Sequence, residues 1–309
     1  MSAFYYYLSC YAYYERIFRL TGKSTISLYN LEVKVKNFLS RETRLKTKTM
    51  NTDSIMPAAN DMCSFFARYS AWLIGCGATC IRLEKNVCRM AAAYGKEVEL
   101  SIMPRHVHIA LKDNDKAEAV TVIASVEQRA VSFNINTRLS ELSWELADHK
   151  INYEQAKRRF DKIVSSDYQS KLTVLLLVTM ANASFCKLFG GDWIAMLIVG
   201  IATLAGYYVK QFMSELHADI RLTVLVCSFV SSVLGATGLL FSLGSTPEIA
   251  LGTSVLYLVP GIPFLNSFSD MLYRHYICAF SRLADALILT CCLSIGLCMG
   301  MLLMNVGMF

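Results

Sequence analysis

The sequence predicts an α-helical membrane protein with about five transmembrane helices, preceded by a small α+β cytoplasmic domain. Of the 309 residues, 54% are hydrophobic and only 17% are charged, whereas soluble domains are about a quarter charged. Long apolar runs dominate the chain from Leu172 onward, and nearly all the charge lies before them. Each run has roughly the 17–25 residues needed to cross a bilayer core of about 30 Å.

This break in composition divides the chain into three predicted parts. Residues 1–56 form an N-terminal extension, which we expect to be disordered or to follow from a start codon placed too early. Residues 57–170 form the cytoplasmic α+β domain, and residues 171–309 the five-span transmembrane domain. The net charge of +6 comes entirely from residues 1–50, with nine Lys or Arg and three acids, so the rest of the chain is neutral and predicts no nucleic-acid partner.

The distribution of Lys and Arg predicts how the spans are oriented. The predicted spans are residues 172–189, 193–209, 222–243, an interrupted 249–267, and 283–304. Basic residues occur before the first span and in the connectors at 210–221 and 270–282, whereas the other connectors have none. The positive-inside rule therefore places the N-terminus in the cytoplasm and the C-terminus outside.

The segment before the spans has the alternating patterns of an α+β domain. The apolar pattern predicts that residues 62–94 are largely helical, with Gly95 as the helix stop. Short alternating runs predict strands at 98–102, 106–111, 120–126 and 131–135. Two amphipathic helices follow, with apolar faces formed by Leu139, Leu142 and Leu146, and by Tyr153, Ala156, Phe160 and Ile163.

Nothing in this segment predicts an enzyme. His106 and His108 share one strand face and could offer two metal ligands, but the commoner origin of such a pair is the solvated face of a half-buried strand. The eleven cysteines show no zinc spacing, and no phosphate-binding loop or nucleophile motif occurs. We therefore predict no catalytic residues, no cofactor and no metal.

The interrupted span contains the most informative segment, LVPGIPFLNSFSD. Pro260, Gly261 and Pro263 should break the helix and leave backbone groups unpaired, which a bilayer tolerates only inside protein or along a wet cavity. Asn266 and Asp270 follow at i and i+4, on one helical face. We predict that these five residues line a substrate pathway, with Asn266 bonding a hydroxyl or carboxylate and Asp270 binding an ammonium group or a coupling proton. The alternative is a simple kink, with Asp270 marking the cytoplasmic end of the span.

Lys187 is the other unusual charge, because it lies deep in the first span near its uncharged outer side. Two interpretations remain open. The side chain either extends to the outer surface or faces the interior and attracts a substrate carboxylate.

Three motifs resemble the threonine/serine exporter (ThrE) family. GATCIRLEKNVCRMAAAYG, with Gly77, Thr79, Arg82 and Glu84, resembles the helix that opens the family's cytoplasmic domain. FCKLFGGDW resembles its first hairpin, especially in the half-length, YjjP-like branch, and LVPGIPFLNSFSDM resembles its Pro-Gly-x-Pro-x-x-Asn-x-x-x-Asp element. The motifs occur in family order and cover roughly residues 60–309. We expect Arg82 and Glu84 to make intradomain or domain–membrane contacts.

The resemblance implies an exporter of small polar metabolites. Threonine and serine are the substrates for which the full-length members are named, and the half-length branch is associated with succinate. The resemblance also implies a small membrane-protein partner that supplies the missing half of the transporter. Whether the chain also forms homo-oligomers stays open. Because no ATP-binding motif occurs, we predict a secondary transporter. The alternatives are a membrane-anchored sensor or scaffold whose cytoplasmic domain is the working part, and a channel.

Overall fold

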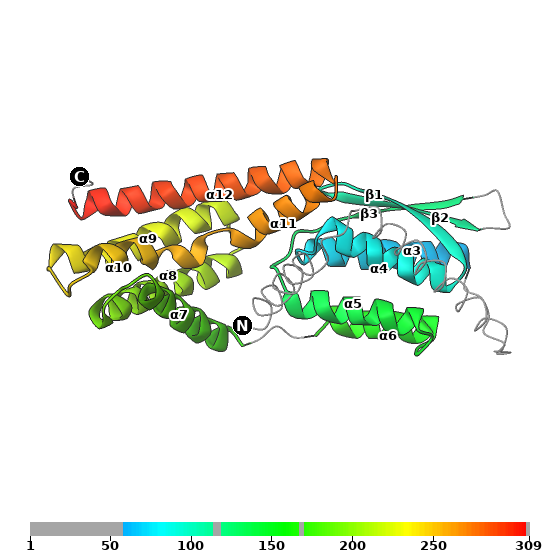
Figure 1. Ribbon diagram of the computed structural model, residues 1–309, viewed down its shortest axis with the longest axis horizontal. Helices are drawn as coiled ribbons and strands as arrows, with labels where there is room; N and C mark the ends of the chain where they lie inside the picture. The colour runs from blue at the N-terminus through cyan, green and yellow to red at the C-terminus, as the bar shows by residue number, and fades with distance from the viewer. Residues whose placement is uncertain (1–57, 114–118, 167–169, 307–309) are drawn as a thin grey trace, which may run out of the picture. The chain divides into compact units, whose positions relative to one another are not determined.

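The computed structural model describes residues 58–113, 119–166 and 170–306, which belong to one unit, Pro57–Phe309 (Figure 1). The predicted extension at 1–56 lies outside the described residues. The α+β region, residues 58–166, contains α3 (Ala59–Gly75), α4 (Cys80–Ala93), β1 (Lys96–Ile102), β2 (His106–Asp113), β3 (Ala119–Ser125), α5 (Phe133–Ala147) and α6 (Tyr153–Val164). The remaining described residues are almost entirely helical, so the predicted fold class is confirmed.

The three strands form an antiparallel sheet in sequence order, and α3 and α4 cover one face of it (Figure 1). The side chains on the covered face of β2 are buried, namely those of Val107, Ile109 and Leu111. His106 and His108 lie on the opposite face, because side chains alternate along a strand. Among the described residues, no three His, Cys, Asp or Glu side chains gather as metal ligands would.

Helices α5 and α6 pack on α3 and α4, on the side away from the sheet (Figure 1). The rings of Phe65 and Phe160 meet edge to face, with centroids 5.7 Å apart. The buried Tyr69 hydroxyl donates to the Leu139 carbonyl oxygen at 2.8 Å and accepts from Asn86 at 3.0 Å. Burial raises the pKa of Tyr69, so the hydroxyl stays neutral and its polar group is satisfied inside the core.

One sequence prediction for this region is wrong and another is incomplete. The segment predicted as largely helical, 62–94, is helical, but a turn in which Gly77 has φ +83° divides it into two helices, α3 and α4. L-residues rarely adopt that conformation, and a Cβ on Gly77 would lie 2.9 Å from Val131 Cγ2. The strand predicted at 131–135 is absent because α5 begins at Phe133, with the Ser132 hydroxyl accepting from the Ile135 N–H at 3.3 Å.

Four described helices are long and apolar enough to cross a membrane. They are α7 (Lys171–Leu188), α8 (Trp193–Glu215), α9 (Ile220–Leu240) and α12 (Tyr276–Leu303). Between α9 and α12 lie α10 (Pro247–Ser254), the short 3-10 helix η1 (Leu256–Leu258) and α11 (Gly261–Leu272). These form a pair bent by 59°, which gives five spans if the pair counts as one.

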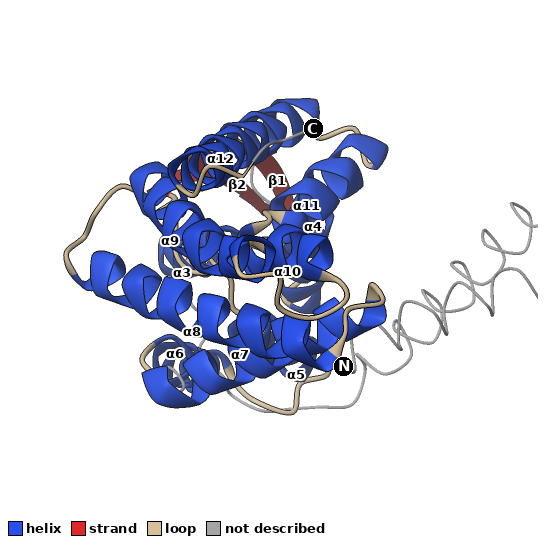
Figure 2. Cartoon of the chain, turned by 90° about the vertical axis from the view of Figure 1, so that its left-hand side faces the viewer, coloured by secondary structure: helices blue, strands red, loops and turns tan. Residues whose placement is uncertain are grey.

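The spans pack through small and hydroxyl-bearing residues. Figure 2 shows the helices end-on, with α10 beside α7, α8 and α9. Between α9 and α12, the Ser228 hydroxyl donates to the Leu293 carbonyl oxygen at 2.7 Å, and a Cβ on Gly296 would lie 2.9 Å from Ser228 Cβ. Close approach of this kind is typical of helix packing in membranes, and it occurs in the Ser/Gly-rich segment of α9.

Candidate functional site at the broken span

The break in the fourth span is where the sequence predicts it. Pro260 lies between η1 and α11, and Pro263 lies in the first turn of α11, where a missing N–H costs nothing. A Cβ on Gly261 would meet nothing within 4 Å, and its φ is not left-handed, so the structure gives no steric reason for glycine there. The chain therefore bends by 59° through its prolines.

The α10 side of the break is held inside the helical bundle. Asn182 of α7 is 3% exposed, and its Nδ2 donates to Thr203 Oγ1 at 2.6 Å and to the Thr253 carbonyl oxygen at 3.0 Å. The second of these bonds goes to a carbonyl near the end of α10, which also accepts a backbone N–H of the helix cap, so Asn182 ties the end of α10 to α7. The sequence-based predictions missed Asn182, although an amide within an apolar run is the signal that could have identified it.

A second polar contact beside the break joins α9 to η1. The hydroxyls of Ser231 on α9 and Tyr257 on η1 are 2.9 Å apart. Gly206 of α8 faces both of them, because a Cβ at that position would overlap the two hydroxyl oxygens. The three helices therefore approach each other closely beside the break.

The α11 side of the break is bound instead to the turn between α3 and α4. Asn266 Nδ2 donates to the Gly77 carbonyl oxygen at 2.8 Å, and the Cys80 backbone N–H donates to Asp270 Oδ1 at 2.8 Å. Thr79 is the N-cap residue of α4, yet its side chain makes no capping hydrogen bond. Asp270, 190 residues after Cys80 in the sequence, therefore takes the place of an N-cap acceptor.

Arg282 of α12 completes this contact, which we call the docking cluster: Gly77, Cys80, Asn266, Asp270 and Arg282. Arg282 Nη2 donates to the Ala78 carbonyl oxygen at 2.7 Å, and Nη1 lies 3.0 Å from Asp270 Oδ2. Nη1 is fully buried and has no well-aligned hydrogen bond, so its contact with Asp270 is mainly one of charge. Asp270 is completely buried, as a carboxylate can be when it is paired and hydrogen-bonded.

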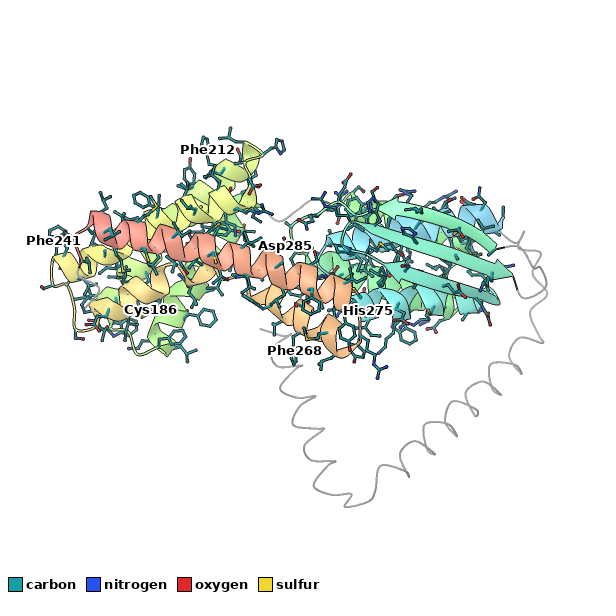
Figure 3. The ribbon with its side chains drawn as sticks, turned by 90° about the horizontal axis from the view of Figure 1, so that it is seen from above. Cys186, Phe212, Phe241, Phe268, His275 and Asp285 are labelled. Carbon is teal, nitrogen blue, oxygen red and sulfur yellow. The ribbon has the colours of Figure 1, made fainter. Side chains whose placement is uncertain are left out.

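Further contacts surround the docking cluster. His275, labelled in Figure 3, lies in the turn between α11 and α12. Its Nε2 lies 3.5 Å from Glu84 Oε2, so Glu84 contacts this turn. Arg82, its neighbour in the same motif, is exposed. The Cys278 thiol donates to the Ile102 carbonyl oxygen at 3.4 Å, and the Cys80 thiol donates to Asp270 Oδ2 at 3.4 Å. The neighbouring Cys278 thiol, burial and the charge of Asp270 raise the pKa of the Cys80 thiol, which therefore stays neutral.

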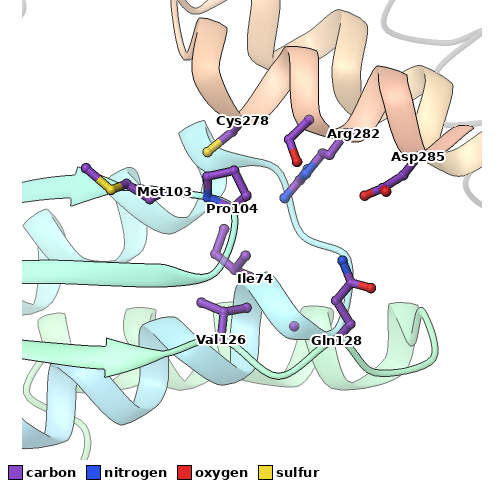
Figure 4. A pocket seen from close by; sticks show the side chains of 10 residues that line it. Ile74, Met103, Pro104, Val126, Gln128, Cys278, Arg282 and Asp285 are labelled. Carbon is purple, nitrogen blue, oxygen red and sulfur yellow. The ribbon is translucent and has the colours of Figure 1, made fainter.

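A small cavity lies beside the docking cluster, between α12 and the α+β region (Figure 4). Cys278, Arg282 and Asp285 line one side of it, and Met103 and Pro104 of the β1–β2 turn line the other. Its volume is about 70 Å³, whereas sites for small ligands usually measure about 300–1,000 Å³. The cavity is therefore a packing gap along the contact.

Lys187 lies apart from all of these groups. Its side chain is exposed, and its Nζ donates to the Gly191 carbonyl oxygen at 3.4 Å and lies 5.2 Å from the centre of the Trp193 ring. The side chain thus points along the chain toward the α7–α8 turn. This geometry favours the first of the two interpretations of Lys187, extension to the surface.

The α7–α8 turn is tied to the loop between α9 and α10. Asp192 Oδ1 accepts from the Ala195 N–H at 2.7 Å and so caps α8, while Oδ2 accepts from the Ser245 N–H at 2.7 Å. The Asp192 N–H donates to Thr246 Oγ1 at 2.9 Å. The hydrogen bonds from the Ser245 and Ala195 backbones lower the pKa of Asp192. Through these hydrogen bonds, the Asp192 carboxylate and backbone hold the α7–α8 turn to the α9–α10 loop at this end of the bundle.

The spans, the bent pair and the buried polar contacts beside the bend define a multi-pass membrane protein with a transporter-like broken helix. The chain belongs to the family described as "Putative threonine/serine exporter", whose model matches residues 64–304. This confirms the family that the three motifs indicate. No solved structure matches the chain.

The similar curated proteins fall into two groups. The chain is 28% identical over 235 residues to "Probable succinate transporter subunit YjjP" of Escherichia coli K12, covering 74% of this chain and 90% of that protein. The protein of the same name from Klebsiella aerogenes is 29% identical, covering 74% and 89%. "Probable threonine/serine exporter" of Mycobacterium tuberculosis is 19% identical over 58% of this chain and 34% of that protein. The chain is thus YjjP-like within an exporter family.

Proposed function

We propose that this chain is one subunit of a secondary exporter in the bacterial inner membrane. Its substrate is a small polar metabolite, either a dicarboxylate such as succinate or the amino acids threonine and serine. The predicted orientation, with the N-terminus in the cytoplasm and the C-terminus outside, places the α+β region on the cytoplasmic side.

One observation carries this proposal: the two sides of the broken span are bound to different parts of the chain. The α10 side is bonded to the bundle through Thr253, and the α11 side is bonded to the turn before α4 through Asn266 and Asp270. Secondary transporters place substrate sites at such breaks and work by moving one part against the other. A protein that is merely anchored in the membrane has no use for this arrangement.

The proposal that this chain works with a separate small membrane protein is supported by two comparisons. The YjjP relatives are named as subunits, and this chain spans about nine-tenths of their length. It matches only 34% of the mycobacterial exporter, so that exporter contains much more chain. A partner protein that supplies the missing transmembrane part accounts for both facts.

The test uses cells of the source organism with the chromosomal copy of the gene deleted. In these cells any partner protein is present in its natural amount. The cells are complemented with the parent chain, with Asp270→Asn or with Asp285→Asn as a control on α12. Export of labelled succinate, and of threonine after loading with a threonine-containing dipeptide, is measured.

We expect export with the parent and the control, and a large loss with Asp270→Asn, because the docking cluster then loses its charge pair. If the parent restores export of neither metabolite, the exporter proposal fails. The alternative, a membrane-anchored sensor or scaffold, is then favoured.

A further inference from the structure

We infer that Lys210 of α8 is the cation that receives a carboxylate group of the exported metabolite beside the broken span. This rests on the proposed function and assigns it a binding residue. The ligand class is a small organic acid with at least one carboxylate, which both a dicarboxylate and an amino acid provide.

The sequence assigns Lys210 to the connector after the second predicted span, but α8 continues to Glu215, so Lys210 is a helical residue that follows the inner face of the bundle. The buried face of α8 includes Val199, Ala202, Thr203 and Gly206. Lys210 follows Gly206 at i+4 and continues this face one turn on, about 6 Å along the axis. Its neighbour Val209 packs against the buried cluster that includes Cys227 of α9.

The direction of the side chain distinguishes Lys210 from a lysine that extends to the surface. Its Nζ lies 5.5 Å from the centre of the Tyr207 ring, three residues earlier, so the ammonium points back along the helix and away from the end at Glu215. Lys187, in contrast, points past the end of its own helix toward Gly191. The centres of the Tyr207 and Tyr257 rings are 6.1 Å apart. Tyr257 is the residue of η1 whose hydroxyl contacts Ser231 beside the break.

The charge of Lys210 has no counter-charge in the part of the chain that the structure describes. No carboxylate among those residues lies within salt-bridge distance of it, whereas Lys171 pairs with Glu215 at 2.6 Å and Arg282 with Asp270 at 3.0 Å. Lys210 is only partly buried, and its ammonium keeps some accessible surface.

An unpaired cation facing the interior of a membrane bundle is costly and usually functional. A substrate carboxylate supplies the missing charge. The Ser231 and Tyr257 hydroxyls, which Gly206 contacts about one helical turn away, are available as hydrogen-bonding groups.

The experiment measures uptake of labelled succinate and of labelled threonine into inside-out membrane vesicles from the complemented deletion cells. Lys210→Met removes the charge, Lys210→Arg keeps it, and Lys187→Met is the matched control that removes a lysine outside the bundle interior. Rates are divided by the amount of chain in the membrane. Lys210→Gln provides the same comparison if the methionine variant does not reach the membrane.

For each metabolite that the parent carries, we expect Lys210→Met to raise KM at least about tenfold. Lys210→Arg should change KM by less than about threefold, and Lys187→Met should leave it at the parent value. A rise for both metabolites supports a shared carboxylate site, and a rise for succinate alone supports a dicarboxylate site. If the parent is active and Lys210→Met has an unchanged KM, the inference fails while the proposed function stands; an equal effect of Lys187→Met has the same meaning. If the parent vesicles carry neither metabolite, the proposed function itself fails.

Discussion

Asp270 and Arg282 form an ion pair, with Oδ2 and Nη1 3.0 Å apart, where the α+β region meets the last two helices. The same carboxylate accepts from the Cys80 N–H at the N-terminus of α4. The position therefore requires a negative charge for two reasons, the guanidinium on one side and the positive end of the α4 dipole on the other.

Removal of the Asp270 charge should strongly destabilise the protein. Asp270→Asn leaves Arg282, whose side chain is 19% exposed, without its partner. Breaking a buried pair in this way costs about 3–5 kcal/mol. Thermal unfolding in detergent measures the effect, with Asp285→Asn as the control. Equal melting temperatures for the two variants would contradict the prediction.

A charge-exchanged variant separates the two reasons for the negative charge at Asp270. In the double variant Asp270→Arg/Arg282→Asp the pair could re-form, but a cation would then face the Cys80 N–H instead of an acceptor. We expect this variant to melt no higher than Asp270→Asn. Recovery of the parent melting temperature would mean that only the charge pair matters and that the contact with α4 does not.

Gly77→Ala should cost more stability than Gly95→Ala. Both glycines have positive φ, +83° and +66°, so each alanine costs roughly 1–2 kcal/mol in backbone conformation. A Cβ on Gly77 also meets Val131 Cγ2 at 2.9 Å, whereas a Cβ on Gly95 meets nothing within 4 Å. The extra cost at Gly77 should be about 1–3 kcal/mol, measured as the difference in unfolding free energy between the variants. Equal costs for the two alanines would show that Val131 yields without strain.

Gly206→Ala should disrupt the bundle beside the break. The new methyl group would overlap the hydroxyls of Tyr257 and Ser231, so η1 or α9 must move. Gly252→Ala is the matched control, since a Cβ there meets nothing within 4 Å and alanine gains about 1 kcal/mol in helix propensity. We expect a lower melting temperature and slower export only with Gly206→Ala. Parent-like values for it would show that the close approach is unimportant.

Asn182→Leu should loosen the attachment of α10. The substitution removes the hydrogen bonds to Thr203 and to the Thr253 carbonyl oxygen, and such bonds in membranes are worth about 0.6–2 kcal/mol. Ser184→Ala, on the exposed side of the same helix, is the control. Differential scanning calorimetry in detergent should show a loss for Asn182→Leu and none for the control.

The contribution of Asp192 should depend on pH. Its pKa is lowered in the folded protein, so the charged form stabilises the fold above the unfolded pKa of about 3.9 and this stabilisation is lost as the pH falls through the folded value. The difference in stability between the parent and Asp192→Asn should be constant from about pH 8 to pH 5 and shrink below about pH 4. A difference that disappears by about pH 6 would point to another group.

The sequence is sufficient to predict the apolar spans, the break at Pro260 and the shared face of Asn266 and Asp270. The apolar runs and the prolines are local features, and local features are what a sequence pattern reports. The division of the first helix at Gly77 was missed because the apolar periodicity continues across the turn. The partners of Asp270 were missed for another reason: Cys80 and Arg282 lie 190 residues before it and 12 residues after it, and no local pattern joins them.

The position of Cys278 has a consequence for the way the chain is made. This residue of α12 belongs to the hydrophobic core of the α+β region, together with residues such as Phe66 and Leu83. During synthesis the N-terminal segments emerge and fold first, so the α+β region must form while this part of its core is still missing. Its core and the N-terminus of α4 are complete only after the last two helices have been inserted. The α+β region therefore reaches its final stability only after these two helices have been inserted correctly.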